Sequence, residues 1–171
     1  FRVPATLLGA KMTGGGDNDE PKNLFMVCNS DIHLPMDAST WFPIEKLTSL
    51  FREAGHHQRR LVLALTRYEG EHGQPPTPCV APLISDYRGS HDAFIFEGSL
   101  PSLFVNSVAH PQNCYKAENI VIHELQHKAG ALVVNPCFDF RIVHRHEADI
   151  RQWLPPVDED RYGRAYPSTL E

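Results

Sequence analysis

The sequence predicts an α+β domain, and three observations lead to this prediction. Short apolar runs bounded by Gly, Pro, Asn or Asp are typical of strands. Longer segments with apolar residues at intervals of three or four positions are typical of amphipathic helices. The two kinds of segment alternate irregularly, which favours a mixed arrangement over a repeated strand–helix–strand unit.

The first part of the chain is expected to contain one helix between two strands. Residues 1–22 include a run of glycines followed by acidic residues, and we expect a flexible leader or loop there. Residues 23–28 are a short apolar run that predicts a strand. Residues 43–54 place apolar side chains on one helical face and predict a helix. Residues 60–66 are apolar almost without interruption and predict a buried strand.

The later part is expected to contain two more strands and a helix. Residues 68–82 are rich in Gly and Pro and predict an exposed connection. Residues 93–97 and 102–106 predict strands, and the free edge of the second could pair with an extended peptide. Residues 117–129 predict a helix, because they contain no Gly or Pro and Gly130 follows them.

The composition describes an ordinary globular chain of one domain. It has 171 residues, 42% hydrophobic and 22% charged, which suffices for a core without a stabilising metal or disulfide. The formal net charge of -5 argues against nucleic acid or an anionic membrane as a partner. No apolar run approaches the roughly 20 residues that cross a bilayer. The sequence begins at Phe1 without an initiator Met or a signal peptide, as expected of a processed or a trimmed chain.

The segment His123-Glu124-Leu125-Gln126-His127 carries the residues expected to do chemistry. On a helix, His123 and His127 lie one turn apart on the same face, where both imidazoles can bind one metal ion. Two neutral imidazoles suit Zn²⁺, and a catalytic zinc site takes a third protein ligand and leaves one position for water. Glu124 lies beside them and could accept a proton from that water. The alternative is a surface helix with two incidental histidines.

The third ligand is expected within residues 141–154, which predict a second helix. One stripe of this helix, with separations of four, three and four positions, consists of Val143, Glu147, Ile150 and Leu154. A carboxylate in an apolar stripe is costly to bury unless a cation neutralises it, so Glu147 is our candidate. The alternatives for Glu147 are a buried salt bridge to an arginine such as Arg141 or Arg145, and a position at the exposed edge of the stripe.

Three other residues compete with Glu147 as the third ligand. Asp139 could reach the metal from the loop between the two helices. His144 is expected on the opposite side of the second helix, in solvent. His146 lies at the edge of the apolar face, where it could pack in the core or hydrogen-bond to a metal ligand.

Residues 117–154 resemble a known family. Their motif, followed by Glu147 in the string His146-Glu147-Ala148-Asp149, resembles the zincin metallopeptidases and specifically the gluzincin branch. Val133 stands where the metzincin branch has its third histidine. The resemblance implies a zincin-like fold, in which a small mixed sheet packs on the active-site helix and a following helix carries the third ligand. We expect residues 1–171 to form one metallopeptidase domain, of which residues 117–154 carry the resemblance.

The resemblance also implies roles for individual residues. His123, His127 and Glu147 would bind one Zn²⁺ per chain, and Glu124 would be the general base. The implied activity is that of a zinc metalloendopeptidase, a hydrolase that cleaves a protein or peptide, and we expect it to be a monomer. The alternative is a non-catalytic zincin-like binding module that recognises a protein partner. An intact Glu124 argues against the module, because a structural zinc site needs no base.

The oxyanion formed during hydrolysis needs a further donor. Tyr162 and Tyr166 are candidates, and both lie in residues 155–171, which we expect to be an irregular C-terminal tail. His146 is a third candidate. Either tyrosine could instead be an ordinary packed or surface aromatic residue.

The chain contains Cys28, Cys79, Cys114 and Cys137. An even number of cysteines permits two disulfides and predicts secretion or another oxidising compartment. Cys114 and Cys137 flank the motif helix and are our preferred pair. The alternative is that all four are reduced thiols in a cytosolic protein.

Overall fold

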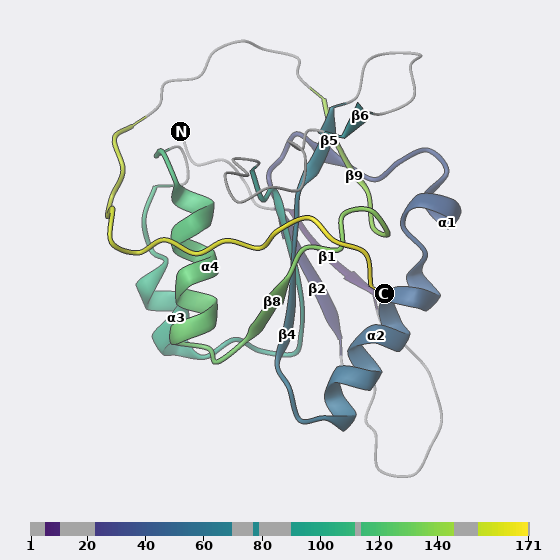
Figure 1. Ribbon diagram of the computed structural model, residues 1–171, viewed down its shortest axis with the longest axis horizontal. Coiled ribbons are helices and arrows are strands. Elements are labelled where there is room, and N and C mark those ends of the chain that lie inside the picture. The colour runs from purple at the N-terminus through teal and green to yellow at the C-terminus, as the bar shows by residue number, and fades with distance from the viewer. Residues whose placement is uncertain are drawn as a thin grey trace.

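The computed structural model describes residues 6–10, 23–69, 77–78, 90–111, 114–145 and 154–170. Within these ranges the chain forms two small β-sheets and four helices (Figure 1). The α+β class predicted from the sequence is therefore confirmed.

The larger sheet has the strand order β1-β2-β7-β4-β8. Its strands are β1 (Thr6–Ala10), β2 (Leu24–Cys28), β7 (Ala93–Glu97), β4 (Leu61–Leu65) and β8 (Leu132–Val134). Neighbouring strands are antiparallel except β4 and β8, which are parallel. The sheet is mixed, as predicted.

The smaller sheet has the strand order β3-β9-β5-β6. Its strands are β3 (Ile32–His33), β9 (Ile142–His144), β5 (Arg67–Glu69) and β6 (Thr77–Pro78). In this sheet β5 and β9 are parallel, and the other pairs are antiparallel. Only Thr66 separates β4 from β5, so the chain passes almost directly from the larger sheet into the smaller one.

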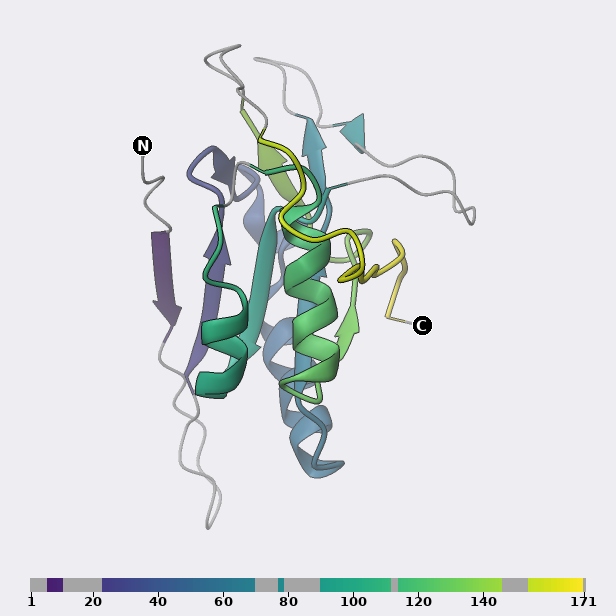
Figure 2. The same cartoon turned by 90° about the vertical axis from the view of Figure 1, so that its left-hand side faces the viewer.

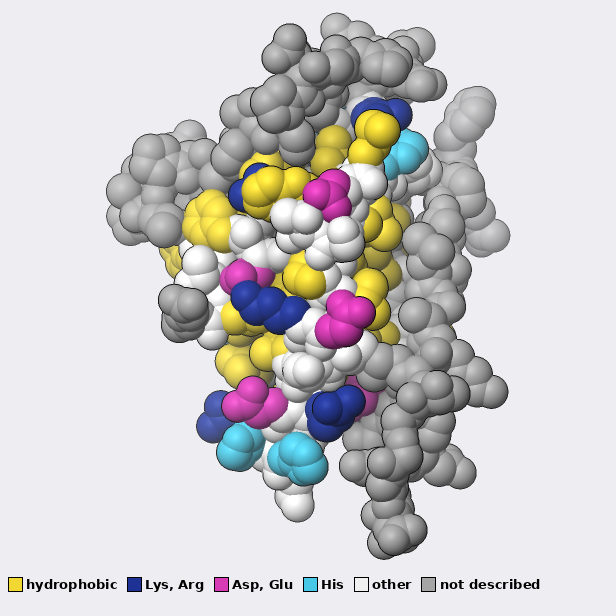
Figure 3. All heavy atoms as spheres, turned by 90° about the vertical axis from the view of Figure 1, so that its right-hand side faces the viewer, with side chains coloured by type: hydrophobic (Ala, Val, Ile, Leu, Met, Phe, Trp, Pro, Cys, Tyr) yellow, Lys and Arg dark blue, Asp and Glu magenta, His cyan; other side chains and the backbone are white. Residues whose placement is uncertain are grey.

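Helices cover both faces of the larger sheet. They are α1 (Ala38–Trp41), α2 (Ile44–His56), α3 (Ser102–Ser107) and α4 (Ala117–His127). Helices α1 and α2 lie on one side of the sheet, and α3 and α4 lie on the other (Figures 1 and 2). Figure 3 looks onto the side of α1 and α2, where acidic and basic side chains are interspersed.

Strand β4 joins the two layers of the core, because all of its residues are buried. Its three leucines belong to the apolar cluster of α2, and the valine and alanine between them belong to the cluster of α4. This alternation follows from the two-residue period of a strand. Burying one leucine contributes about 1.5–3 kcal/mol, so β4 holds the two helical layers in a fixed relation.

Several predicted elements form close to their predicted bounds. They are β2, β4, β7, α2 and α4. Gly130, with a φ of 61°, follows α4 as the predicted C-terminal glycine. These elements have strong periodic patterns and clear boundary residues, which explains why the sequence locates them.

The strand predicted at residues 102–106 is wrong, because these residues form α3. Pro101 begins the helix, Phe104 is buried, and Leu103 and Val105 are exposed. A short apolar run fits either structure, and here a single buried aromatic on one face suffices for a helix. The proposed pairing of a peptide with this strand is also wrong, and β7, the strand that precedes it, lies inside the sheet.

The second helix predicted at residues 141–154 is also wrong where the structure describes it. Residues Ile142–His144 form β9, which pairs with β3 and β5, and Leu154 makes an isolated bridge with Cys114. A strand buried on both faces is apolar at consecutive positions, so a helical stripe can be drawn through it by coincidence. Residues 146–153, which include His146 and Glu147, lie outside the described residues.

His144 is buried rather than solvated, with 1% of its surface exposed. Its Nδ1 lies 2.9 Å from Oε2 of Glu69, and its Nε2 lies 3.0 Å from Oδ2 of Asp31. Arg67 extends this network, because Nε contacts Glu69 at 2.9 Å and Nη1 contacts Asp92 at 3.0 Å. These charged contacts tie the smaller sheet to the start of β7.

The predictions for the leader, for the connection at residues 68–82 and for the tail have different outcomes. Within the predicted leader, Thr6–Ala10 form β1 and pair with β2. Within the predicted connection at residues 68–82, Tyr68 is buried in β5. Residues 155–170 contain no helix or extended sheet strand, as expected of an irregular tail. No helix in the described part combines the length and apolar character needed to cross a bilayer.

The preferred disulfide does not form. Cys28, Cys114 and Cys137 are free thiols, and Cys79 lies outside the described residues. The Cys114 thiol donates to the Pro111 carbonyl at 3.0 Å. Burial raises the pKa of Cys137 to about 12, so this thiol stays protonated inside the core.

Acid should weaken the smaller sheet through Glu69. Burial raises the pKa of this carboxyl group, but hydrogen bonds from His144 and Arg67 outweigh that effect and lower the pKa to about 2, from 4.5. The ionised form therefore stabilises the fold above about pH 4.5, and this stabilisation is lost as the pH falls towards 2. We expect Glu69→Gln to lower the free energy of unfolding near neutral pH by about 1 kcal/mol, allowing for solvent screening.

Thermal unfolding followed by circular dichroism would measure this effect. The difference between the wild type and Glu69→Gln should shrink as the pH falls from 4.5 towards 2. Glu45→Gln, a change at an exposed glutamate of α2, is the control. A difference that stays constant over this range would contradict the assignment.

Candidate metal centre

Packing of α4 against the larger sheet sets the direction of the motif side chains. Ile120, Ile122 and Leu125 are buried, so this side of the helix faces the core. His123 is half-buried and His127 is exposed, and both therefore lie towards the outer side of α4. The helix thus holds the two imidazoles on one face, as the motif predicts.

The two imidazole rings are stacked. Their centroids are 4.0 Å apart, and the planes differ by 22°. Nδ1 of His127 lies 2.7 Å from the carbonyl oxygen of His123. Because a carbonyl oxygen only accepts hydrogen bonds, Nδ1 carries the proton and the lone pair of the neutral ring is on Nε2. His127 is therefore in the tautomer that binds a metal through Nε2.

The two rings are neighbours on one face of α4, which is the first requirement for ligands of a shared metal ion. Within the described ranges, no group of three histidine, cysteine or acidic side chains is placed to hold a metal ion. Glu147 and His146 lie outside those ranges, so their predicted roles stay predictions.

Two competitors for the third ligand are engaged elsewhere. Asp139 pairs with Lys46 of α2, and its Oδ2 accepts from the backbone N–H of Leu170 at 2.8 Å. His144 is held between two carboxylates in the smaller sheet. Neither side chain is available to the histidines of α4 in this arrangement.

Glu124 is almost completely buried, with 2% of its surface exposed. Its Oε1 lies 3.5 Å from Nη1 of Arg161, a long contact for an ion pair. Its Oε2 has no hydrogen-bond partner in the described part of the chain. An unsatisfied buried carboxylate oxygen is costly, and a metal-bound water or a proton would lower that cost. Oε2 of Glu124 therefore suits a proton acceptor.

Arg161 is the residue that faces Glu124 from the C-terminal tail. Its Nε donates to Asp158 at 2.8 Å, and its Nη1 donates to the carbonyl oxygen of Ser107 at 3.0 Å. These contacts join the tail to the end of α3. Oε1 of Glu124 therefore faces a guanidinium group that these contacts hold in place, whereas Oε2 does not hydrogen-bond to it.

The tail continues as an extended strap, residues 162–168, which crosses α4 and then passes beside β8 (Figure 1). The N–H of Gly163 donates to the carbonyl oxygen of Asn119 at 2.9 Å, and the side chain of Asn119 donates to the carbonyl oxygen of Gly163 at 2.8 Å. This reciprocal pair fixes the crossing point one turn before His123.

The crossing leaves no room for a side chain at Gly163. A Cβ there would lie 2.5 Å from the backbone nitrogen of His123 and 2.9 Å from the carbonyl carbon of Ile122. These neighbours are helix backbone and cannot move aside cheaply. Only glycine fits at this position, because a side chain would clash with the backbone of α4.

Further along, the strap is anchored at the junction of the two sheets. The side chain of Asn135 accepts from Thr66 N–H at 3.1 Å and donates to Thr66 Oγ1 at 2.8 Å. It also donates to the carbonyl oxygen of Ala165 at 3.0 Å, which His91 Nε2 contacts at 2.9 Å. Burial lowers the pKa of His91, so the ring is neutral and donates through Nε2. The backbone N–H of Ser168 donates to the Asn135 carbonyl oxygen at 2.9 Å.

Hydrogen bonds contribute about 1 kcal/mol each, whereas ordering one residue costs about 1–2 kcal/mol. The residues that the strap buries are the small Gly163, Ala165 and Pro167. Ordering seven residues costs about 7–14 kcal/mol, so the hydrogen bonds do not hold the strap alone, and the burial of Ala165 in the core adds to them.

Tyr162, the predicted oxyanion donor, lies on the outer side of the strap with 36% of its surface exposed. Its hydroxyl contacts Nε of Arg164 at 3.1 Å, and Lys116 lies 5.4 Å from its ring centre. The hydroxyl of Tyr166 lies 3.4 Å from Nη1 of Arg164. The predicted role of Tyr162 is neither supported nor contradicted by these contacts.

Sequence reasoning missed Arg161, Gly163, Asn119 and Asn135. One signal was present, because residues 162–168 alternate between large and small side chains. Such alternation is typical of an extended segment with one buried face. The contacts with α4 join residues far apart in the chain, which a local pattern does not reveal.

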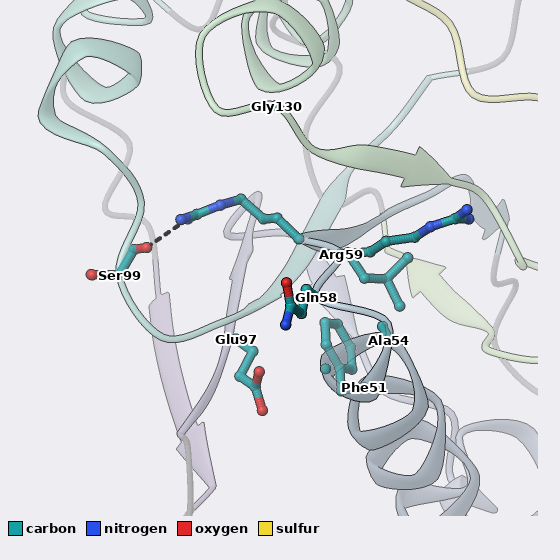
Figure 4. Close-up of a pocket in the computed structure, with 10 residues that line it drawn as sticks. Phe51, Ala54, Gln58, Arg59, Glu97, Ser99 and Gly130 are labelled. Atoms are coloured by element: carbon teal, nitrogen blue, oxygen red, sulfur yellow. Dashed lines mark hydrogen bonds between the residues drawn. The ribbon is translucent and has the colours of Figure 1, made fainter.

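A hollow of about 490 Å³ lies at the end of the larger sheet near the start of β4 (Figure 4). Arg60 lines it and donates to the carbonyl oxygen of Ser99 at 2.7 Å. Arg59 points away from Ser99, and Glu97 also contributes to the lining (Figure 4). The motif residues of α4 do not line this hollow, so it is separate from the candidate metal centre.

Comparisons with protein-family models, with curated proteins and with solved structures find no significant match to this chain. The assignment of the centre therefore depends on the sequence motif and the geometry around α4.

Replacing Asn135 should weaken the fold more than replacing Asn119. Asn135→Ala removes hydrogen bonds to both Thr66 and the strap and leaves buried groups unsatisfied, so we expect a loss of about 2–3 kcal/mol in the free energy of unfolding. Asn119→Ala removes one side-chain hydrogen bond and should cost about 1 kcal/mol. Urea denaturation measures both values. Equal losses would show that Asn135 does not anchor the sheet junction.

Proposed function

We propose that the chain is a zinc-dependent peptidase, in which His123, His127 and Glu147 bind one Zn²⁺ and Glu124 is the general base. The observation that carries this proposal is that one helix presents two stacked imidazoles and a buried carboxylate whose Oε2 lacks a partner in the described part. A mixed sheet packed against α4 fits a zincin-like arrangement.

The residues of the chain have separate tasks in this proposal. The chemistry that bound Zn²⁺ supplies is a lowered pKa of water, to about 7, and polarisation of the substrate carbonyl. His127 keeps its proton on Nδ1 through the His123 carbonyl and offers Nε2 to the metal. Arg161 faces Oε1 of Glu124, so Oε2 is the oxygen that accepts and holds the proton.

Tyr162 and His146 stay our candidates for the oxyanion donor. Tyr162 directly follows Arg161, which faces the base. The proposed substrate is a protein or peptide, and the proposed working form is a monomer. Secretion remains a prediction, and the free thiols of Cys114 and Cys137 lend it no support.

A second candidate is the non-catalytic zincin-like module that recognises a protein partner. The observation that favours it is the burial of Glu124 beneath the tail, opposite Arg161. A carboxylate used only as a structural ion-pair partner would be arranged in the same way. Turnover separates the two candidates.

Glu124→Gln should separate zinc binding from catalysis. The amide keeps the shape of the side chain but accepts no proton, so turnover should fall by about 10²–10⁴-fold while one zinc per chain stays bound. Elemental analysis and digestion of a peptide library measure the two properties. Glu118→Gln, a change in the first turn of the same helix, is the matched control. A wild type that binds zinc but cleaves no peptide would favour the module.

Substitution of the ligands should identify the third one. We expect His127→Ala and Glu147→Ala each to weaken zinc binding by more than about 100-fold, because each removes one of three protein ligands. Asp139→Asn and His57→Ala should leave the affinity unchanged, because Asp139 is engaged by Lys46 and His57 follows α2. Competition with a chromogenic chelator measures the affinities. Unchanged zinc affinity in Glu147→Ala would remove Glu147 from the site.

A further inference from the structure

The surface beneath the strap has the features of a binding site for an extended peptide. It consists of one face of α4 and the end of β8, with Asn119, His91 and Asn135 as its polar side chains. His91 and Asn135 are each 1% exposed and both contact the same strap carbonyl group. These groups contact the backbone of the strap, not its side chains.

We propose that this surface is a peptide-binding groove, which the strap occupies in the intact chain and from which another peptide can displace it. Its ligand class is an extended peptide with small residues at alternate positions, of the pattern Gly163-x-Ala165-x-Pro167. A peptide of this pattern in another molecule would compete with the strap for the same groove.

The burial pattern of the strap shows what the groove accepts. Gly163, Ala165 and Pro167 are buried, whereas Tyr162 and Tyr166 are exposed. Alternate residues of an extended chain point to opposite sides. The groove therefore takes small side chains on one side and leaves the other side of the peptide unrestricted.

Backbone contacts are typical of sites that bind extended peptides. A peptide added beside a strand gains affinity from main-chain hydrogen bonds, and pockets for alternate side chains give selectivity. The strap makes such contacts with Asn119 at Gly163 and with Asn135 at Ser168. A parallel bridge between Asn135 and Pro167 continues the edge of β8.

The strap is also held in a way that permits exchange. It belongs to no helix and to no multi-residue strand, and the residues that it buries are small. A second peptide could form the same contacts with the groove. The competing strap in the same chain lowers the apparent affinity for any peptide from outside.

The groove also lies beside the candidate metal centre. Gly163 approaches the backbone of His123, and Arg161, next to the strap, contacts Glu124. The proposed exchange needs neither zinc nor turnover, so it does not depend on the proposed peptidase activity.

A binding experiment with the full chain tests the groove. The probe is a fluorescently labelled synthetic peptide with the sequence of residues 160–170, and fluorescence anisotropy without added zinc is the readout. The chain variant Gly163→Ala places a Cβ against the backbone of His123 and should displace its own strap. We expect this variant to bind the probe about tenfold or more tightly than the wild type. A probe that itself carries Gly163→Ala should bind neither chain.

Two control variants accompany this test. Tyr166→Ala changes an exposed residue of the strap, and Gly98→Ala strains the backbone outside the strap, because Gly98 has a φ of 67°. Both chains should bind the probe as weakly as the wild type. Tighter binding by either control would show that general destabilisation, rather than displacement of the strap, exposes the groove.

The remaining outcomes of this experiment also test the proposal. If the Gly163→Ala chain binds the probe no more tightly than the wild type, the proposal is wrong. If that chain fails to fold, the added probe should restore its near-ultraviolet circular dichroism. Failure of the probe to restore it would show that the strap is a fixed part of the fold. The result is independent of whether Glu124→Gln changes turnover, so the two proposals fail separately.

Discussion

The burial of the Glu124 carboxylate constrains which groups must lie around α4. A carboxylate with 2% of its surface exposed must be compensated by a cation, by hydrogen bonds or by a proton. Arg161 supplies one cation at 3.5 Å, and Asp158 and Ser107 hold that guanidinium in place. Because Oε2 has no partner among the described residues, these residues compensate the carboxylate only in part. This partial compensation, on the helix that also carries His123 and His127, makes the centre a candidate for chemistry.

The rest of the fold places Arg161 where this constraint requires it. The junction between the two sheets at Thr66 is completed by the side chain of Asn135, which also binds the carbonyl group of Ala165. From Ala165 the strap runs to Gly163, where the absence of a side chain lets it lie directly on α4. The sheet therefore positions the strap, and the strap positions the arginine next to it.

Periodic local patterns made part of this structure predictable from the sequence. The helix of the motif and the strands β2, β4 and β7 have such patterns, and each formed near its predicted position. The prediction failed at α3 and β9, where short apolar runs fit either structure and tertiary contacts decide. The motif located His123 and Glu124, but their contacts with the tail link residues distant in the chain. No local pattern could show that Gly163 would lie on the backbone of His123.

The central claim is that the stacked imidazoles of α4 bind zinc together with a third protein ligand. Anomalous scattering at the zinc absorption edge, from crystals grown with zinc, tests it most directly. The account predicts one zinc ion at about 2.1 Å from Nε2 of both His123 and His127, with a third ligand from the protein. Zinc bound to other residues, or no zinc peak beside α4, would contradict it.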